Sequence, residues 1–221
     1  MWQWSKVGEL DASRFSPGRI RFQLFVGNDI YGWVYRKRGG LTVEGRENIP
    51  AEGSLIICGN HRSFLDPPIL TSATQRHMLF MAKKELWENK FFGGLLDALG
   101  AIPINREKPE LATLRFIKQV MKTGWSMGMF IEGTRSKIPG QMGPPQKGCA
   151  YFAKATNSPI LPVGIIGSDD KTKKLLVRIG KPIMPGPDLD AVTWQVMEAL
   201  SALTGDKLPP REPVLNQEPK A

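Results

Sequence analysis

The stretch SLIICGNHRSFLDPP, residues 54–68, decides how the chain is expected to fold. Ser54 to Cys58 is a compact and mostly apolar run, which is typical of a buried strand. Asp66 stands directly before two prolines, and proline is favoured in the first turn of a helix. The stretch therefore predicts a buried strand, a polar turn and a helix that begins at Asp66.

Further strands and helices are predicted on both sides of this unit. Apolar or alternating runs predict strands, and apolar residues at helical spacing predict helices. Strands that alternate with helices indicate an α/β core. The strands are expected at residues 41–44, 78–81, 101–104, 125–131, 159–166 and 175–179, and the helices near residues 85–99, 111–121, 149–155 and 189–203, the last one capped by Asp188.

Three parts are expected along the chain. Residues 1–40 form an N-terminal segment, and residues 41–206 form one α/β domain, the default for 221 residues. The proline-rich stretch over residues 207–221 has little periodicity, so we expect a disordered tail there.

The balance of charged residues points to anionic partners. The chain has 30 Lys and Arg against 21 Asp and Glu, a net charge of +9 at pH 7. Nucleic acid, anionic membranes and phosphorylated substrates all attract such a protein. Cys58 and Cys149 lie far apart in unrelated contexts, so we expect neither a disulfide framework nor a metal-ligand cluster. A reducing compartment fits this cysteine usage best.

Residues 1–40 combine cations with aromatic side chains. Seven Lys or Arg stand there against three Asp or Glu, a balance of +4, with tryptophan, tyrosine and phenylalanine interspersed. Such a mixture suits the interface of an anionic bilayer. We expect an amphipathic helical segment that docks on a membrane. The alternative is that the rings are core residues of a solvated segment.

This N-terminal segment lacks the pattern of a membrane-spanning helix. A span needs about 18 consecutive apolar residues, and the best candidate, residues 22–35, is interrupted by polar residues and glycine. The charge-free apolar region of a signal peptide is also missing. We therefore expect a peripheral protein that lies on the cytoplasmic face of a membrane.

His61 and Asp66 are the first candidates for chemistry. A carboxylate that bonds one ring nitrogen of a histidine fixes its tautomer and leaves the other nitrogen free to take a proton. In a strand-to-helix turn, Asp66 can fold back onto His61 in this way. The alternative is that Asp66 simply caps the helix and His61 makes an ordinary hydrogen bond. The second histidine, His77, precedes an apolar run and is interpreted as structural.

A second group of candidates is cationic. Arg106, Arg135 and Lys83 each follow a predicted strand, and strand ends at one edge of a sheet converge. Two or three cations gathered there would make a phosphate site. Taken singly, each cation is better explained as a solvated surface charge. Glu132 would cap, bind the acceptor or pair with an arginine.

Four segments, in this order, resemble the motif blocks of the glycerolipid acyltransferase superfamily, the first of them with the form H-x4-D. A fifth segment resembles the lead-in of its 1-acylglycerol-3-phosphate (lysophosphatidic acid) acyltransferases. The likeness extends over residues 41–180. The segments are NHRSFLD (Asn60–Asp66), GAIPINR (Gly100–Arg106), FIEGTRS (Phe130–Ser136) and ILPV (Ile160–Val163), after the lead-in LTVEGRENIP (Leu41–Pro50).

The resemblance implies a mixed, largely parallel sheet flanked by helices, behind an N-terminal membrane-docking element. It implies transfer of a fatty acyl group from a thioester to the sn-2 hydroxyl of 1-acylglycerol 3-phosphate, which gives phosphatidic acid in phospholipid biosynthesis. The thioester is acyl-CoA or acyl carrier protein as a co-substrate, and no cofactor or metal is expected. The expected partners are lysophosphatidic acid and an anionic bilayer surface, and not nucleic acid.

The resemblance also implies roles for single residues. His61 is the general base that deprotonates the acceptor hydroxyl, and Asp66 orients it, without a covalent acyl-enzyme. Two arginines hold the acceptor's phosphate, with a lysine as a third cation, and the glutamate, glycine and threonine of the third block shape the acceptor site. These acceptor-site residues are Arg106, Arg135, Lys83, Glu132, Gly133 and Thr134.

One position departs from the family pattern. Many members have F-K-x-G after the third block, whereas this chain has Pro145-Gln146-Lys147-Gly148. The cation is displaced by one residue, so Lys147 is left out of the expected site.

Three other interpretations stay open. Glycerol 3-phosphate or another lysolipid would serve as the acceptor within the same enzyme class. A lipid-binding protein with an inactive site is a second interpretation, which the presence of both His61 and Asp66 disfavours. A nucleic-acid-binding protein is the third, and the concentration of cations at motif ends and at the N-terminus speaks against it.

Overall fold

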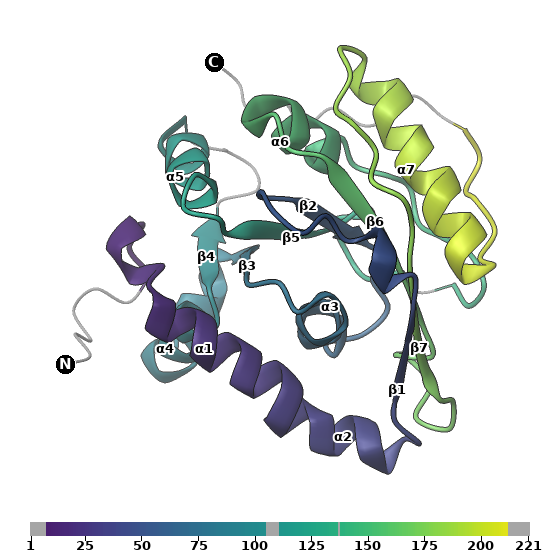
Figure 1. Ribbon diagram of the computed structural model, residues 1–221, viewed down its shortest axis with the longest axis horizontal. Helices are drawn as coiled ribbons and strands as arrows, with labels where there is room; N and C mark the ends of the chain where they lie inside the picture. The colour runs from purple at the N-terminus through teal and green to yellow at the C-terminus, as the bar shows by residue number, and fades with distance from the viewer. Residues whose placement is uncertain (1–7, 105–110, 137, 212–221) are drawn as a thin grey trace.

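β2 (Ile56–Gly59), the strand that precedes His61, is the middle strand of a sheet with the order β1-β7-β6-β2-β5-β3-β4 (Figure 1). The computed structural model describes residues 8–104, 111–136 and 138–211. Within these ranges the other strands are β1 (Leu41–Glu44), β3 (Met78–Lys83), β4 (Ala101–Ile104), β5 (Ser126–Phe130), β6 (Ile160–Ile166) and β7 (Leu175–Ile179). The helices are α1 (Pro17–Phe25), α2 (Tyr31–Lys37), α3 (Asp66–Thr74), α4 (Lys90–Ala98), α5 (Leu111–Met121), α6 (Gly148–Thr156) and α7 (Leu189–Thr204), with short 3-10 turns at Ala12–Arg14, Arg46–Asn48 and Lys84–Trp87.

The sheet is mixed but mostly parallel, as the family resemblance implies. β6, β2, β5, β3 and β4 pair in parallel, whereas β7 runs antiparallel to β6 and takes β1 as its parallel partner at the edge. The carboxyl ends of the five parallel strands therefore meet at one edge of the sheet, where ligands bind in open α/β sheets. The turn with His61 follows β2 at this edge.

The alternation of side chains along β2 builds a core on each face of the sheet. Ile56 and Cys58 pack with residues of α5, α6 and α7, while the neighbouring Leu55 and Ile57 pack with residues of α2 and α3. Figure 1 shows the same layers, with α5, α6 and α7 on one side of the sheet and α1 to α4 on the other. A strand buried on both faces explains why its sequence is apolar at every position.

The N-terminal segment is helical from Pro17 to Lys37, with a π-helical stretch at Val26–Ile30 between α1 and α2. The predicted helical segment is confirmed over these residues; residues 1–7 lie outside the described part of the chain. The inner side of this helical segment packs against the α/β domain. The buried amide of Gln23 bonds the backbone N–H and C=O of Met78, and Tyr35 is in the core.

The outer side of this helix exposes large apolar side chains to solvent, with charged residues such as Asp29 and Arg36 exposed beside them. Phe25 and Trp33 are 52% and 55% exposed, and Phe22 and Ile30 are exposed with them. Buried Tyr35 fits the interpretation that the aromatic residues are core residues, whereas membrane docking by the exposed rings stays a prediction. Among the described residues, no helix combines the length and hydrophobicity that a membrane crossing requires.

The first residue of the predicted tail differs from the expectation. Residues 207–221 are predicted to be disordered, but Lys207 pairs with Gln141 in a β-bridge, its N–H donates to Gly140 and its carbonyl accepts from Met142. Backbone pairing with a distant loop orders a residue whose own sequence has no periodicity. Residues 212–221 lie outside the described residues.

Candidate active site

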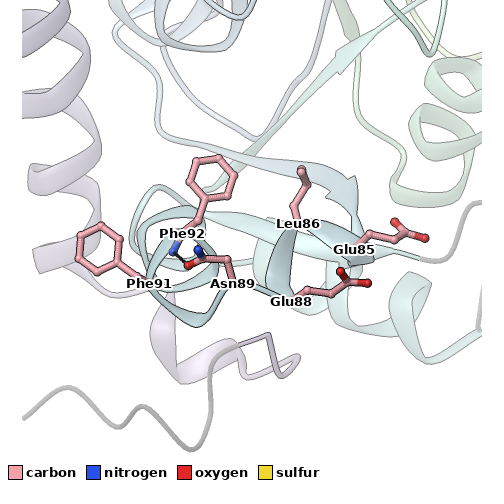
Figure 2. Close-up of a pocket in the computed structure, with 6 residues that line it drawn as sticks. All are labelled: Glu85, Leu86, Glu88, Asn89, Phe91 and Phe92. Carbon is pink, nitrogen blue, oxygen red and sulfur yellow. Dashed lines mark hydrogen bonds between the residues drawn. The ribbon is translucent and has the colours of Figure 1, made fainter.

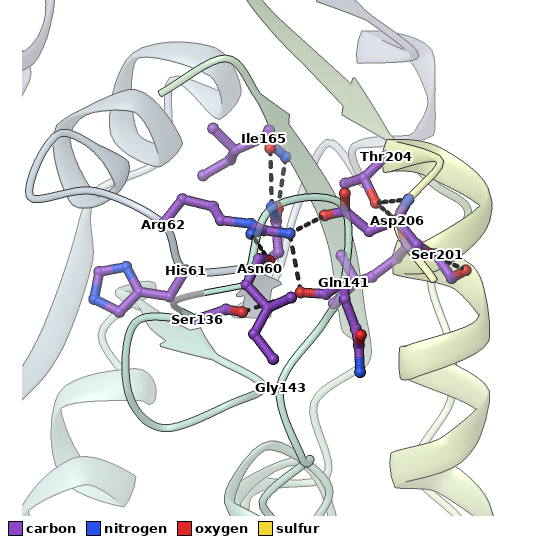
Figure 3. A network of polar contacts seen from close by, with 12 residues as sticks. Asn60, His61, Arg62, Ser136, Gln141, Gly143, Ile165, Ser201, Thr204 and Asp206 are labelled. Carbon is purple, nitrogen blue, oxygen red and sulfur yellow. Dashed lines mark hydrogen bonds and ion pairs between the residues drawn. The ribbon is translucent and has the colours of Figure 1, made fainter. Parts of the chain in front are cut away.

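The turn after β2 begins with Asn60, whose side chain extends the sheet. Its Oδ1 atom accepts a hydrogen bond from the N–H of Ile165 at 2.7 Å, and its Nδ2 atom donates to the carbonyl of the same residue at 2.9 Å. The amide thus replaces one further backbone pair between β2 and β6 (Figure 3). This fixes the point at which the chain leaves the sheet, one residue before His61.

The side chains of His61 and Asp66 meet, as predicted. Nδ1 of His61 lies 2.8 Å from Oδ2 of Asp66, and the Asp66 carboxylate is fully buried. The same oxygen accepts the N–H groups of Arg62 and Ser63, both at 2.7 Å. Because an ionised carboxylate only accepts, Nδ1 carries the ring proton and Nε2 is the basic nitrogen.

This geometry decides between the two interpretations of Asp66. Asp66 is the first residue of α3, Leu65 occupies the N-cap position, and no side chain caps the helix. The carboxylate turns back toward the preceding loop and bonds the imidazole instead.

Phe130 supports the other side of the imidazole. Its ring stacks on that of His61 with a centroid distance of 4.0 Å and an angle of 12° between the planes. The contact arises because Phe130 of β5 pairs with Gly59 of β2, two residues before His61. Within the described part of the chain, Nε2 of His61 has no hydrogen-bond partner, and the side chain remains 19% exposed. The imidazole is therefore held on two sides and open on the third.

Glu132 is buried beneath the turn and acts on the backbone. Its Oε2 atom accepts the N–H of His61 at 3.0 Å and its Oε1 atom accepts the N–H of Gly143 at 2.9 Å. Burial raises the pKa of this carboxyl, while the two backbone donors oppose the shift. Glu132 thus shapes the site by joining two loops, with both oxygens occupied by backbone groups.

The third block also brings Arg135 to the first. The guanidinium of Arg135 lies 3.9 Å from the ring centroid of Phe64, a residue of the His61–Asp66 turn that is 78% exposed. Thr134 is exposed beside it, and Gly133 adopts a left-handed φ of +65°. The positive φ makes the sharp turn that carries the chain from buried Glu132 to exposed Arg135.

Of the other two predicted cations, the structure describes one. Lys83 is the exposed last residue of β3, at the same edge of the sheet as His61. Arg106 lies outside the described residues; β4, which precedes it, also ends at this edge. Lys147, left out of the expected site, forms an ion pair with Asp190 at 2.9 Å.

Three residues with contacts that hold the turn around His61 were not predicted from the sequence: Asn60, Arg62 and Phe130. All three stand inside the quoted blocks, next to or one residue away from predicted site residues, so adjacency to the blocks was the available signal. His77 lies at the opposite end of the sheet, because it precedes β3, and its ring packs edge-on against Trp125.

A hollow of about 580 Å³ opens at the start of α4. Figure 2 shows Leu86, Phe91 and Phe92 along it, with the polar side chains of Glu85, Glu88 and Asn89. None of these residues belongs to the motif blocks, although the first of them, Glu85, is two positions after Lys83 in the chain. We do not assign the reaction to it.

Fold and site together define a class of protein, an α/β protein with a hydrogen-bonded histidine–aspartate pair at the carboxyl edge of its sheet. The chain belongs to the acyltransferase family, whose model matches residues 40–166.

Relatives of known name support this assignment. The chain is 30% identical over 152 residues to the 1-acyl-sn-glycerol-3-phosphate acyltransferase of Bacillus subtilis, a match that covers 66% of this chain and 75% of that protein. It is 33% identical over 132 residues to the enzyme of the same name from Borreliella burgdorferi, which covers 59% of this chain and 52% of the relative.

A solved structure has the same fold. The crystal structure of the 1-acyl-sn-glycerophosphate (LPA) acyltransferase PlsC from Thermotoga maritima superposes with a TM-score of 0.68 at 24% identity. The match covers 83% of this chain and 77% of that one. It supports the α/β architecture described above.

Proposed function

We propose that the protein transfers a fatty acyl group from a thioester to the sn-2 hydroxyl of 1-acylglycerol 3-phosphate and so forms phosphatidic acid. The observation that carries this proposal is the 2.8 Å contact between Nδ1 of His61 and the buried Asp66, which leaves Nε2 open. The names of the relatives support this acceptor, and acyl-CoA or acyl carrier protein remains the expected donor.

The chemistry follows from the open ring nitrogen. Nε2 of His61 takes the proton of the acceptor hydroxyl while the oxygen of that hydroxyl attacks the thioester carbonyl. The carbon–sulfur bond then breaks, and the thiol leaves with the proton that the imidazolium returns. Asp66 stabilises the imidazolium that forms between these steps. Positioning supplies much of the acceleration because the thioester is already activated.

The acceptor's phosphate is proposed to bind to the cations at the carboxyl edge of the sheet. Arg135 and Lys83 both lie at this edge, and the family pattern adds Arg106. A guanidinium suits a phosphate monoester because it forms two parallel hydrogen bonds. Glycerol 3-phosphate carries the same phosphate, so it is the alternative acceptor in the assay.

We further propose that the outer side of the helix over residues 17–37 docks on an anionic bilayer. Phe22, Phe25, Ile30 and Trp33 are exposed along it, and the ammonium of Lys37 lies 3.8 Å from the Trp33 ring centroid. Aromatic rings with adjacent cations suit the headgroup region. Docking would bring the site to the surface from which the lysolipid arrives.

The test of the reaction compares the chain's two histidines. His61→Ala is expected to lower transfer of a labelled acyl group to lysophosphatidic acid by about 100-fold or more, while His77→Ala keeps it. Circular dichroism checks that both variants are folded. Near-normal turnover of the His61 variant would remove this residue from the mechanism, and an inactive wild-type protein would favour a lipid-binding role.

The test of the phosphate site is a comparison of KM values. Arg135→Gln is expected to raise the KM for lysophosphatidic acid about 10-fold or more and the KM for the acyl donor little, because Arg135 is proposed to bind the phosphate of the acceptor and not the donor. Lys118→Gln, which neutralises an exposed cation of α5, is the control. Equal changes in both KM values would contradict the assignment of Arg135.

The test of docking uses substitutions, because deletion of the helix would remove buried Gln23 and Tyr35 from the fold. Phe25→Gln with Trp33→Gln is expected to release the protein from phosphatidylglycerol vesicles in a flotation assay. Leu111→Gln, which changes an exposed residue of α5 on the other side of the sheet, is the control. Unchanged flotation of the double variant would place the docking surface elsewhere.

A further inference from the structure

Arg62 follows the catalytic histidine, but its side chain points to the other side of the turn (Figure 3). Its Nη1 atom donates to the carbonyl of Ile138 at 2.6 Å, and its Nη2 atom donates to the carbonyl of Gln141 at 3.1 Å. Nη2 also forms an ion pair with Asp206 at 2.8 Å, with only 7% of the arginine side chain exposed. We call these contacts of Arg62 with Ile138, Gln141 and Asp206 the Arg62 clamp.

The backbone of Arg62 belongs to the catalytic pair. Its N–H donates to Oδ2 of Asp66, the same atom that bonds Nδ1 of His61. One residue thus bonds the orienting carboxylate with its main chain and the loop over residues 138–142 with its side chain. A displacement of the guanidinium is transmitted to Asp66 through a single residue.

The loop is tied to His61 by a second route. The carbonyl of His61 accepts the N–H of Ser136 at 2.9 Å, and the Ser136 hydroxyl donates to the carbonyl of Gln141 at 3.0 Å. On the other flank, Glu132 joins the N–H of His61 to that of Gly143. Both backbone polar groups of His61 therefore depend on the segment over residues 132–143.

Asp206 brings the end of α7 into this network. Gly205, with φ at +79°, ends α7, and the carbonyl of Asp206 accepts the Ser201 hydroxyl at 2.7 Å. The next residue, Lys207, bonds Gly140 and Met142 through its backbone. The carboxylate is thus fixed between a helix end and the loop, in position to neutralise a guanidinium that is nearly buried.

We infer that Arg62 and Asp206 are positioning residues for acyl transfer, through which the segment after α7 sets the position of His61. This inference rests on the proposed function, since it takes His61 as the base. A buried charge that loses its partner is costly, so the loop and the turn would rearrange when either member is neutralised. A small displacement of a base is enough to lower turnover about 100-fold.

The kinetic test uses Asp206→Asn, Arg62→Gln and the double variant. Each single variant is expected to lower kcat about 10- to 100-fold and to change both KM values less than about 3-fold. The double variant should have a kcat no lower than that of the less active single variant, because the two residues act as one unit. Glu44→Gln, which removes the exposed Arg178–Glu44 pair with the same 2.8 Å distance, should keep full kcat.

A spectroscopic test separates positioning from general loss of stability. The chain contains two histidines, so labelled histidine gives two imidazole signals in an NMR spectrum. Asp206→Asn should shift the His61 signal and leave the His77 signal in place. If this variant does not fold, Arg62→Gln, which neutralises the other member of the pair, takes its place, with the same shift expected.

Two results would overturn the inference. One is a folded Asp206→Asn or Arg62→Gln variant with wild-type kcat, and the other is an unchanged His61 signal. A wild-type protein without transfer activity would instead count against the proposed function, and the NMR result would still report on the clamp. The failures of the two proposals are therefore distinguishable.

Discussion

The rings of His61 and Phe130 lie face to face, with centroids 4.0 Å apart and planes inclined by 12°. Asp66 bonds one edge of the imidazole, so the aromatic ring is the second restraint on its orientation. The two restraints come from different elements, Asp66 from α3 and Phe130 from β5.

Phe130→Ala is predicted to lower kcat about 10-fold or more, because the imidazole gains freedom to rotate away from the attacking hydroxyl. Phe130→Leu, which keeps apolar bulk but not the flat ring, should fall between the alanine variant and the wild type. Steady-state kinetics with lysophosphatidic acid measure both. Full activity of the alanine variant would show that the Asp66 contact alone is sufficient.

Glu132→Gln is predicted to destabilise the fold by about 1 to 3 kcal/mol, since an amide NH2 would face a backbone donor that now bonds a carboxylate oxygen. Burial raises the pKa of Glu132 in the folded protein. The folded state therefore retains the proton more strongly than the unfolded state, and this group's contribution to stability falls as pH rises above about 4.5.

The free energy of unfolding of wild type and Glu132→Gln, measured from pH 4.5 to 7, checks this prediction. The advantage of the wild type should be largest at the acidic end and should decline to a plateau. An advantage that grows with pH would mean that the two backbone donors outweigh burial.

His77 should give the opposite pH dependence. Burial and the neighbouring Arg76 lower the pKa of its imidazole from 6.5. The folded state thus resists protonation, and stability is lost as pH falls below about 6.5 toward the folded pKa. Thermal unfolding at pH 7.5 and 5.5 should show a smaller acid-induced decrease in Tm for His77→Gln than for the wild type. An equal decrease would assign the acid sensitivity to other groups.

Gly133→Ala is predicted to cost about 1 to 2 kcal/mol for its left-handed backbone and to lower transfer as well. A Cβ atom there would lie 2.9 Å from Cγ of Gln146, so the turn that follows Glu132 must shift. Gly124→Ala is the matched control, because its φ is +91° and its Cβ would meet no atom within 4 Å. Equal stability losses with activity lost only at Gly133 would support the prediction; activity lost equally in both would contradict it.

Much of the fold was accessible from local patterns. The strands at Leu41–Glu44, Ala101–Ile104 and Leu175–Ile179 have the predicted bounds, since their alternation or burial is written in consecutive residues. Asp188 caps α7 as predicted, with its side chain accepting two backbone N–H groups. The contact of His61 with Asp66 is also local, because one turn contains both.

The features that were not predicted from the sequence depend on contacts between residues far apart in the chain. The stack of Phe130 on His61 requires the register of β5 against β2, which neither strand encodes alone. Arg62 and Asp206 are 144 positions apart, and a proline-rich stretch gives no sign of pairing with a loop. The antiparallel direction of β7 is likewise set by its partners in the sheet.

The place of β1 in the sheet has a consequence for the order of folding. Among the described strands, β1 forms its ladder with β7 alone, and its residue Glu44 pairs with Arg178, which is synthesised 134 positions later. During translation the backbone groups of β1 therefore bond water until β7 has been synthesised, when nearly the whole domain has left the ribosome. Closure of the sheet at that edge is a late and slow event, because a long loop must be ordered before the pairing is rewarded.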